Sequence, residues 1–140
     1  MQISRYTDYA YRVLMYLAIN DQHRVTMVEI AEFYGISREH LRKVVHRLAS
    51  LKYIHTYTGK GGGMELSETL ENINLGQVFL EFEGRNSLID CQQTHCPLRT
   101  SCDLNRIFYK AQDAFLNEIS QYTLQDVLHN SVMVNKLMNT

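Results

Sequence analysis

The residues of this chain that are best suited to chemistry are its three cysteines, Cys91, Cys96 and Cys102. They follow the pattern Cys-x4-Cys-x5-Cys within a stretch of twelve residues. An odd number of cysteines argues against a framework of disulfides, and thiolates are soft ligands that suit iron–sulfur clusters or zinc. The surrounding segment shows little periodicity, so we expect a loop that wraps a metal on which the three sulfurs converge.

Two other uses of these cysteines stay open. The first is a zinc site with His95 or Asp90 as the fourth ligand. The second is a thiol switch that forms disulfides without a metal. A cysteine nucleophile would need a base and a pocket, and the chain contains no GxSxG, Walker or Rossmann motif. We therefore expect no enzymatic activity.

Basic residues are concentrated in the segment 36–63, although the whole chain has a net charge of −1. This segment contains six basic residues and one acidic residue, whereas the rest of the chain contains eight basic and fourteen acidic residues. A basic stretch on an acidic body is typical of a protein that binds an anionic partner such as nucleic acid. A plain solvated helix face is the alternative.

The basic segment begins with the signals of a helix-turn-helix. Thr26 and Glu29 form a capping-box pattern that opens a short helix, which ends at Gly35. Ser37 then caps a second helix that runs to about Ser50. Two short helices joined by such a turn are typical of a DNA-binding helix-turn-helix.

A glycine-tipped hairpin is expected after these helices. Residues 53–58 alternate and are rich in β-forming residue types, residues 59–63 read GKGGG, and residues 64–66 form a second strand. The order of these elements predicts a winged helix, and a generic small α/β domain is the alternative. We therefore expect a mostly α fold with a small β-hairpin, namely a winged helix-turn-helix plus a long dimerisation helix.

In such a domain the first turn of the recognition helix faces base edges, and later residues reach phosphates. Ser37 and Arg38 can donate to base acceptors, and Glu39 can accept from a cytosine amino group. The glycines of the wing leave room for Lys60 to approach a DNA backbone. The predicted DNA-binding residues are Ser37, Arg38, Glu39, His40, Arg42, Lys43, Arg47, Lys60, Gly61 and Gly62.

Helices are also expected on both sides of the winged segment. A first helix begins at Ser4 or Thr7 and stops near Asn20, and another begins after Asn74 and ends near Gly84. A long helix is expected over residues 103–122, with an apolar stripe close to a coiled-coil seam. This stripe has to be buried, either against a second copy of the same helix or against the chain's own first helix. Its members are Leu104, Ile107, Phe108, Ala111, Phe115, Ile119 and Tyr122.

These signals divide the chain into four parts. A DNA-binding domain over residues 1–84 is followed by a cysteine loop over 85–102, a dimerisation helix over 103–122, and a short helix with a tail over 123–140, of which about the last ten residues are expected to be loose. The chain has no apolar run of about 18–20 residues, the length that spans a membrane. Its N-terminus does not have the pattern of a signal peptide, so we expect a cytoplasmic protein without a membrane partner.

Three features together resemble a known family. They are residues 4–12 (SRYTDYAYR), the GKGGG wing and the Cys-x4-Cys-x5-Cys loop. Over nearly the whole chain they are similar to the iron–sulfur winged-helix repressors, the relatives of IscR, and most similar to the members that sense nitric oxide. IscR-like members have five residues in the first gap and a histidine three positions after the last cysteine. This chain has four residues in that gap and Asn105 at that position, so the IscR-type fourth ligand is absent.

The resemblance implies a homodimer with crossed long helices that binds a near-palindromic double-stranded DNA operator. It implies an iron–sulfur cluster, of the 4Fe–4S or the 2Fe–2S type, on Cys91, Cys96 and Cys102, with the partner subunit's Asp8 as the fourth ligand. It also implies that nitric oxide is the signal that relieves repression, while iron supply and oxidative stress stay open as alternatives. For Asp8, a surface ion pair with Arg5 or Arg12 on its own helix is the simpler alternative.

Overall fold

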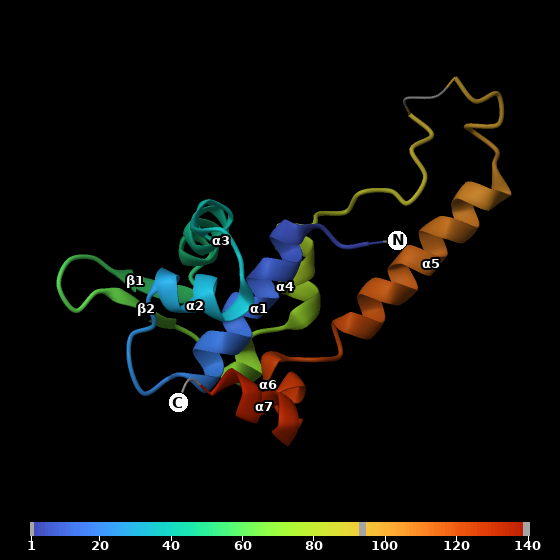
Figure 1. Cartoon of the computed structure of the whole chain (residues 1–140). Helices are drawn as coiled ribbons and strands as arrows, with labels where there is room; N and C mark the ends of the chain where they lie inside the picture. The colour runs from blue at the N-terminus through green and yellow to red at the C-terminus, as the bar shows by residue number, and fades with distance from the viewer. Residues whose placement is uncertain (1, 93–94, 139–140) are drawn as a thin grey trace.

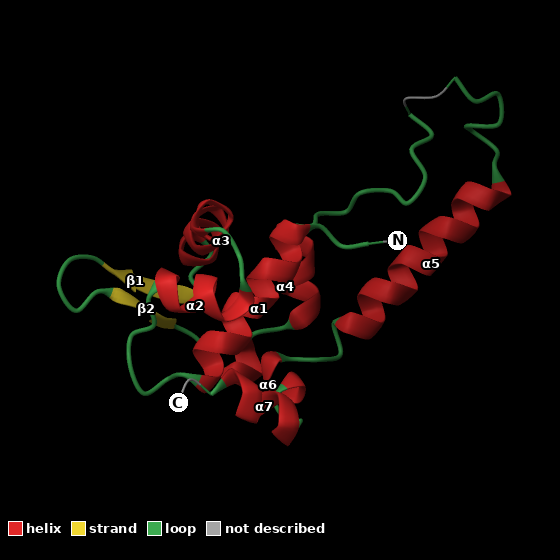
Figure 2. Ribbon diagram, viewed as in Figure 1, coloured by secondary structure: helices red, strands yellow, loops and turns green. Residues whose placement is uncertain are grey.

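The computed structural model describes residues 2–92 and 95–138, and it consists of a helical body with a two-stranded hairpin and one long helix that projects from this body (Figures 1 and 2). The predicted mostly α fold with a small hairpin is confirmed. The elements, in chain order, are α1 (Arg5–Ile19), α2 (Met27–Tyr34), α3 (Arg38–Ser50), β1 (Ile54–Tyr57), β2 (Gly63–Leu66), the short 3-10 helix η1 (Leu70–Asn72), α4 (Leu75–Phe82), α5 (Asp103–Ile119), α6 (Leu124–Val127) and α7 (Ser131–Leu137).

Helix α1 lies at the centre of the body and contacts α3, α4, α7 and the hairpin. It begins after Ser4, whose hydroxyl accepts a hydrogen bond from the Thr7 backbone N–H at 3.2 Å. Side chains that recur at helical spacing along α1 are fully buried, among them Val13, Leu14 and Tyr16. Burial of this face against several elements anchors the domain, because apolar burial is the main stabilising term in a small fold.

The predicted helix-turn-helix is confirmed, together with its capping residues. Thr26 caps α2 in a complete capping box with Glu29, and Gly35 ends α2 in the left-handed conformation, with a φ of 66°. The hydroxyl of Ser37 accepts from the His40 N–H at 3.3 Å and so caps α3. The turn between the two helices is therefore determined by short-range signals that the sequence carries.

Strands β1 and β2 form the expected antiparallel hairpin, with Ile54 opposite Leu66 and Tyr57 opposite Gly63. A short pairing that the sequence did not reveal extends this hairpin. The Val25 N–H donates to the Met64 carbonyl at 3.0 Å, and the Met64 N–H donates to the Val25 carbonyl at 2.8 Å. The segment before α2 thus ties the base of the hairpin to the helix-turn-helix.

The C-terminal end of α5 packs against α4. Helix α5 ends at Ile119, so the predicted extension to Tyr122 is wrong. The carbonyl of Tyr122 accepts from the Leu75 N–H at 3.0 Å, and the Asn74 side-chain amide donates to the Ser120 carbonyl at 2.8 Å. These hydrogen bonds join the residues that follow α5 to the N-terminus of α4, so the chain leaves the helical conformation after Ile119. Gly76 lies against Ser120, where a Cβ would come within 2.8 Å of the Ser120 Cα, so a glycine is required for this close approach.

The C-terminal segment is not a loose tail, which corrects the expectation for it. Residues 131–137 form α7, and Leu137 is only 4% exposed. The buried side-chain amide of Asn20 donates to the Leu137 carbonyl at 2.8 Å, which joins α7 to the end of α1. In the part of the chain that the structure describes, no helix combines the length and the apolar character that crossing a bilayer requires.

Candidate nucleic-acid interface and metal site

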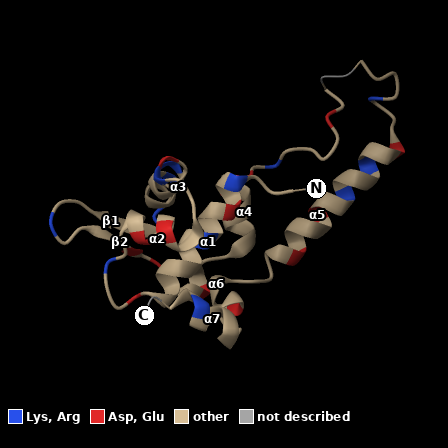
Figure 3. Cartoon of the chain, in the orientation of Figure 1, with Lys and Arg blue, Asp and Glu red and all other residues tan. Residues whose placement is uncertain are grey.

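Helix α3 separates a buried face from a charged face. Leu41, Val44, Val45 and Leu48 are buried against the body. The predicted DNA-binding side chains are exposed on the rest of the helix surface, where Figure 3 shows basic residues gathered. They are Arg38, Glu39, His40, Arg42, Lys43 and Arg47. The folded chain thus presents a mostly cationic helix surface of the kind that enters a DNA groove.

His46 belongs to the same surface, although sequence reasoning did not select it. It is exposed and follows Lys43 by three positions and Glu39 by seven. This spacing places the three side chains in one stripe, on the side of α3 that lies opposite Leu41 and Leu48. The helical period would have identified His46, because its position relative to the buried residues can be counted from the sequence.

The tip of the wing depends on glycine at several positions. Gly59 and Gly61 both have a φ of 78°, and a Cβ on Gly62 would lie 2.6 Å from the Tyr57 carbonyl oxygen. Lys60 is exposed at this tip. The hairpin therefore holds its one charged tip residue on a tight backbone that other residue types would distort.

Arg24 is a second cation at the wing, and sequence reasoning missed it. Its guanidinium lies 3.5 Å from the centre of the Tyr57 ring, and its Nη1 donates to the Gly61 carbonyl at 3.3 Å. The Tyr57 hydroxyl in turn donates to Glu65 at 2.7 Å. Arg24 therefore stiffens the wing and adds positive charge beside it. No local motif marks this role, because the contact joins segments that are distant in sequence.

Replacing Gly62 with alanine is expected to weaken DNA binding by moving the wing tip. The added methyl group would press on the Tyr57 and Gly59 carbonyl oxygens, and loss of a wing contact worth about 1.4 kcal/mol lowers affinity about tenfold. Fluorescence anisotropy with a labelled duplex measures this change. Thr58→Ala, an exposed neighbour on the same hairpin, is the matched control. Equal affinities for Gly62→Ala and the wild type would show that the tip geometry does not matter.

The three cysteines belong to residues 85–102, the segment that leads from the body to the N-terminal end of α5 (Figure 1). Within the described parts of residues 85–102, which exclude residues 93 and 94, this segment forms neither helix nor strand. Cys91, Cys96 and Cys102 are free and partly exposed. Cys102 directly precedes α5, and its side chain makes no capping hydrogen bond. All three thiols are therefore available as ligands.

The isolated chain does not gather these thiols into a finished site. Among the residues with described positions, no group of three or more His, Cys, Asp or Glu side chains lies close enough together to hold a metal ion. His95 and Asp90, the alternative zinc ligands, are both exposed, and Asp90 accepts from the Gln92 N–H at 3.1 Å. The donor set itself fits a thiolate-bound metal, because soft sulfur ligands are present and no disulfide uses them.

Asp8 forms the ion pair that the sequence offered as an alternative to metal ligation. Both Nε and Nη2 of Arg12 lie 3.0 Å from its Oδ2, and the Asp8 side chain is 37% exposed. The hydrogen bond with Asp8 raises the pKa of the Arg12 guanidinium. This guanidinium also lies 5.9 Å from the Tyr9 ring centre and 5.5 Å from that of Tyr34. Asp8 therefore sits at the surface of α1 with one oxygen occupied.

Glu83, at the end of α4, links the base of the cysteine loop to the start of α1. Its carboxylate accepts from the Ser4 N–H at 3.1 Å, from the Ser4 hydroxyl at 2.7 Å, and from the Thr7 hydroxyl. Burial opposes ionisation of Glu83, but the hydrogen bonds from Thr7 and Ser4 outweigh it and lower the pKa of the carboxyl. The residue thus acts as a cap for α1 that is supplied by another element.

Replacing Glu83 with glutamine is expected to lower the free energy of unfolding by about 1 kcal/mol near neutral pH, the usual value of a helix cap. Because the pKa of Glu83 is lowered in the folded state, its contribution is fully present above the ordinary pKa of a glutamate. The contribution disappears as the pH falls through the lowered value. Urea unfolding at neutral and acidic pH measures this, with Glu71→Gln, at an exposed position of η1, as control. A Glu83→Gln loss that did not shrink on acidification would contradict the assignment.

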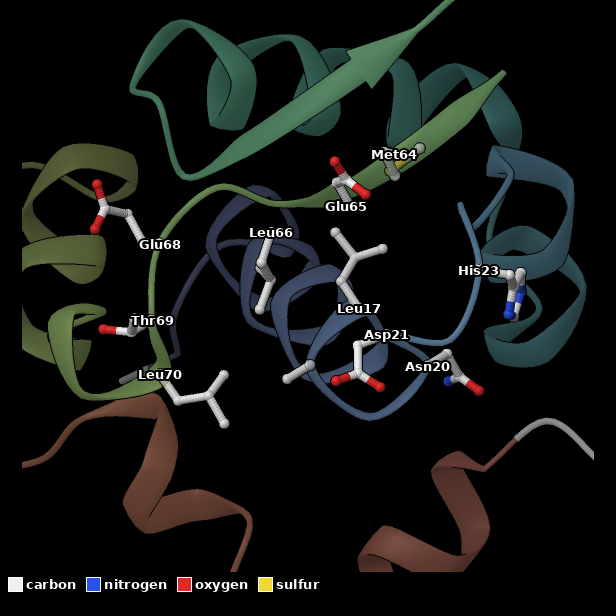
Figure 4. A pocket seen from close by; sticks show the side chains of 11 residues that line it. Leu17, Asn20, Asp21, His23, Met64, Glu65, Leu66, Glu68, Thr69 and Leu70 are labelled. Carbon is white, nitrogen blue, oxygen red and sulfur yellow. The ribbon is translucent and has the colours of Figure 1, made fainter. Parts of the chain in front are cut away.

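A hollow of about 270 Å³ lies on another side of the body, between the end of α1 and β2 (Figure 4). Asp21, Glu65 and Glu68 line it together with His23 and apolar side chains. Three carboxylates repel an anionic partner. This hollow is therefore not part of the nucleic-acid interface.

The projecting part of α5 exposes much of the predicted apolar stripe. Leu104 and Ile107 are each 56% exposed and Phe108 is 40% exposed, while Leu116 is buried. Phe115 contacts Phe79 of α4 with ring centres 5.1 Å apart. The chain's own body thus covers the C-terminal end of α5 and leaves the N-terminal half of the stripe open. Exposed apolar patches of this kind are typical of interaction surfaces.

Comparisons with known proteins agree with these features. Residues 3–130 match the model of the Rrf2 family, described as an iron-dependent transcriptional regulator. The chain is 38% identical to the HTH-type transcriptional regulator NsrR of Bacillus licheniformis, over 99% of this chain and 100% of that protein. The fold resembles oxidised CymR of Staphylococcus aureus, with a TM-score of 0.73, 23% identity, and coverage of 92% and 97% of the two chains. It also resembles IscR of T. potens, with a TM-score of 0.72, 18% identity, and coverage of 94% and 88%.

Proposed function

Because the chain belongs to the Rrf2 family of transcriptional regulators and is of the NsrR type, we propose that it is a homodimeric repressor whose operator binding is switched off by nitric oxide acting on an iron–sulfur cluster. One observation carries this proposal. Three free cysteines occupy an irregular loop that ends at the first turn of an uncovered apolar helix. A change at these thiols therefore acts directly on the element best suited to join two subunits.

In this proposal residues 1–84 form the DNA-binding domain, 85–102 the metal loop, 103–122 the dimerisation segment, and 123–140 the C-terminal segment. Each subunit places α3 in the major groove of a near-palindromic duplex, with Lys60 and Arg24 of the wing beside the backbone. Symmetry then sets the half-sites about one helical turn apart. As a regulator that acts on the chromosome, the protein would work in the cytoplasm, without catalysis and without a membrane partner.

The thiolates of Cys91, Cys96 and Cys102 are the ligands that this chain offers to a cluster, and the partner subunit's Asp8 is the fourth. When bound, such a cluster supplies iron atoms with which nitric oxide reacts. Arg12 competes with the metal for Asp8, since the Arg12 donors occupy its Oδ2. A carboxylate that exchanges between a metal and an arginine is a weak ligand, which suits a sensor that has to release its clamp.

The residues of this chain carry the change in affinity. While the thiolates and the partner subunit's Asp8 are bound to one cluster, the cysteine loop cross-links the start of α5 to α1 of the other subunit. The two α3 helices then keep a fixed spacing. Once these side chains are released, the loop regains its freedom and the spacing relaxes. A differential binding free energy of about 3 kcal/mol changes affinity more than a hundredfold.

Anaerobic purification followed by analysis of iron, acid-labile sulfide and zinc tests the metal assignment. We expect a brown protein that contains iron and sulfide and whose visible absorbance is bleached by nitric oxide. A colourless protein with one zinc per chain would instead establish a structural zinc site. A metal-free protein that retains redox-dependent DNA binding would establish a thiol switch. Bleaching by superoxide or by iron depletion, but not by nitric oxide, would assign a different signal.

A further inference from the structure

A small basic hollow lies between the start of α1 and the recognition helix. It has a volume of about 250 Å³ and is lined by Arg5, Tyr6, Tyr9, His40, Lys43 and Val44. Three of these residues come from α3, among them His40 and Lys43, and the other three, which include Arg5 and Tyr9, come from α1. No carboxylate lines the hollow, which distinguishes it from the acidic hollow at the other end of α1.

The positive charges of this hollow are not neutralised by the chain. In the segments 2–92 and 95–138, no ion pair involves Arg5, His40 or Lys43. Asp8, the acidic residue closest to Arg5 on α1, is instead paired with Arg12. Arg5 and Lys43 therefore bring two cationic side chains without a counter-ion to one hollow, beside the ring of His40, and such a group favours an anion.

Aromatic contacts hold the walls of the hollow in place. The rings of Tyr9 and His40 lie 6.3 Å apart between centres, and the ring of Tyr6 packs on Phe82 with centres 4.9 Å apart. Val44 is buried and forms the floor on the α3 side. Because α1 and α3 share one core, Arg5 keeps a fixed position relative to the side chains that read DNA.

We propose that this hollow binds a backbone phosphate of duplex DNA next to the base pairs that α3 reads. Arg5 is the central ligand, with His40 and Lys43 from the opposite wall. Arginine and lysine are the usual phosphate ligands, and such contacts fix the register of a protein on the duplex. This inference rests on the proposed DNA-binding function. It adds the first helix to the interface and makes Lys43 and His40 part of a phosphate clamp.

The test compares the salt dependence of DNA binding for Arg5→Gln and the wild type, both purified anaerobically as full chains. A labelled duplex of random sequence is the probe, and anisotropy is measured over a range of salt concentrations. Each phosphate contact that is lost lowers the slope of log affinity against log salt by about 0.9. Lys136→Gln, an exposed cation on α7, is the matched control. Arg5→Lys keeps the charge and is expected to keep most of the slope.

The outcomes separate this inference from the function on which it rests. A slope that falls for Arg5→Gln but not for Lys136→Gln supports the clamp. Equal slopes for both variants, with normal wild-type binding, overturn the clamp and leave the repressor intact. Absence of salt-dependent DNA binding by the wild type overturns both. If inorganic phosphate raises the melting temperature in an Arg5-dependent way while the DNA slope is unchanged, the hollow is a free-anion site and the clamp is overturned.

Discussion

Replacing Cys96 with serine is expected to abolish retention of iron and sulfide and to weaken operator binding by more than about a hundredfold, the effect of about 3 kcal/mol of lost differential binding. A serine hydroxyl does not ionise at neutral pH and is a poor substitute for a thiolate on soft iron. Cys91→Ser and Cys102→Ser should behave in the same way, because each removes one of three sulfurs from a single site. Iron and sulfide analysis and a gel shift on anaerobic protein measure both effects.

Ser101→Ala is the matched control for the cysteine variants, because Ser101 is an exposed residue of the same loop, next to Cys102. It should keep the metal, the affinity and the response to nitric oxide. Circular dichroism would verify that each cysteine variant keeps its helices, as expected for positions outside the buried core. If serine variants repressed as well as the wild type and still responded to nitric oxide, the cysteines would have no part in sensing.

Replacing Ile107 with glutamate is expected to convert the protein to a monomer and to lower operator affinity by about a hundred- to ten-thousandfold. The Ile107 side chain is 56% exposed on the open half of the α5 stripe, so a charge there does not disturb the core of the chain. In a dimer the same charge would be buried without a partner, which is strongly unfavourable. A monomer also loses the second half-site, whose effective concentration multiplies affinity about a hundred- to ten-thousandfold.

Sedimentation measures the loss of the dimer. Anisotropy with an operator duplex, selected in vitro for tight binding to the wild type, measures the loss of affinity. Asn117→Glu is the control, since Asn117 is exposed on the same helix and lies outside the apolar stripe. It adds the same charge and should leave the dimer intact. A dimeric Ile107→Glu protein with full operator affinity would show that the stripe is covered by something other than a second copy.

The elements that the sequence predicted well are those defined by local signals. Ser4, Thr26 and Ser37 each cap a helix through hydrogen bonds to residues three positions away. Gly35 ends α2 in a conformation that favours glycine. Because these interactions span a few residues, their position can be read without knowledge of the fold. The basic face of α3 followed in the same way from helical spacing.

The features that the sequence did not predict depend on contacts between distant segments. Helix α5 ends before Tyr122 because the backbone of that residue caps α4. Leu137 is buried because the amide of Asn20 and the face of α1 receive it. Neither partner is marked by a motif. Local periodicity therefore overestimated the length of α5 and left α7 unassigned.

The residues of the candidate site also differ in whether local sequence signals or contacts between distant segments identify them. The structure leaves the three cysteines and the predicted side chains of α3 accessible, and their roles as metal ligands and DNA contacts stay predictions. Arg24 and Arg5, which we add to the proposed interface, were not predicted, because each becomes relevant only when the fold places it beside Tyr57 or opposite His40. Convergence of the three sulfurs remains a prediction, since it depends on a metal and on Asp8 of a second subunit.

The most direct test of the account is the affinity of one anaerobic preparation for its selected operator, measured before and after stoichiometric nitric oxide and after removal of iron by a chelator. Visible absorbance of the same sample reports the state of the metal site. The account predicts tight binding by the untreated protein and a loss of affinity of more than about a hundredfold after either treatment. Equal affinity in the three states, with the absorbance bleached, would contradict it.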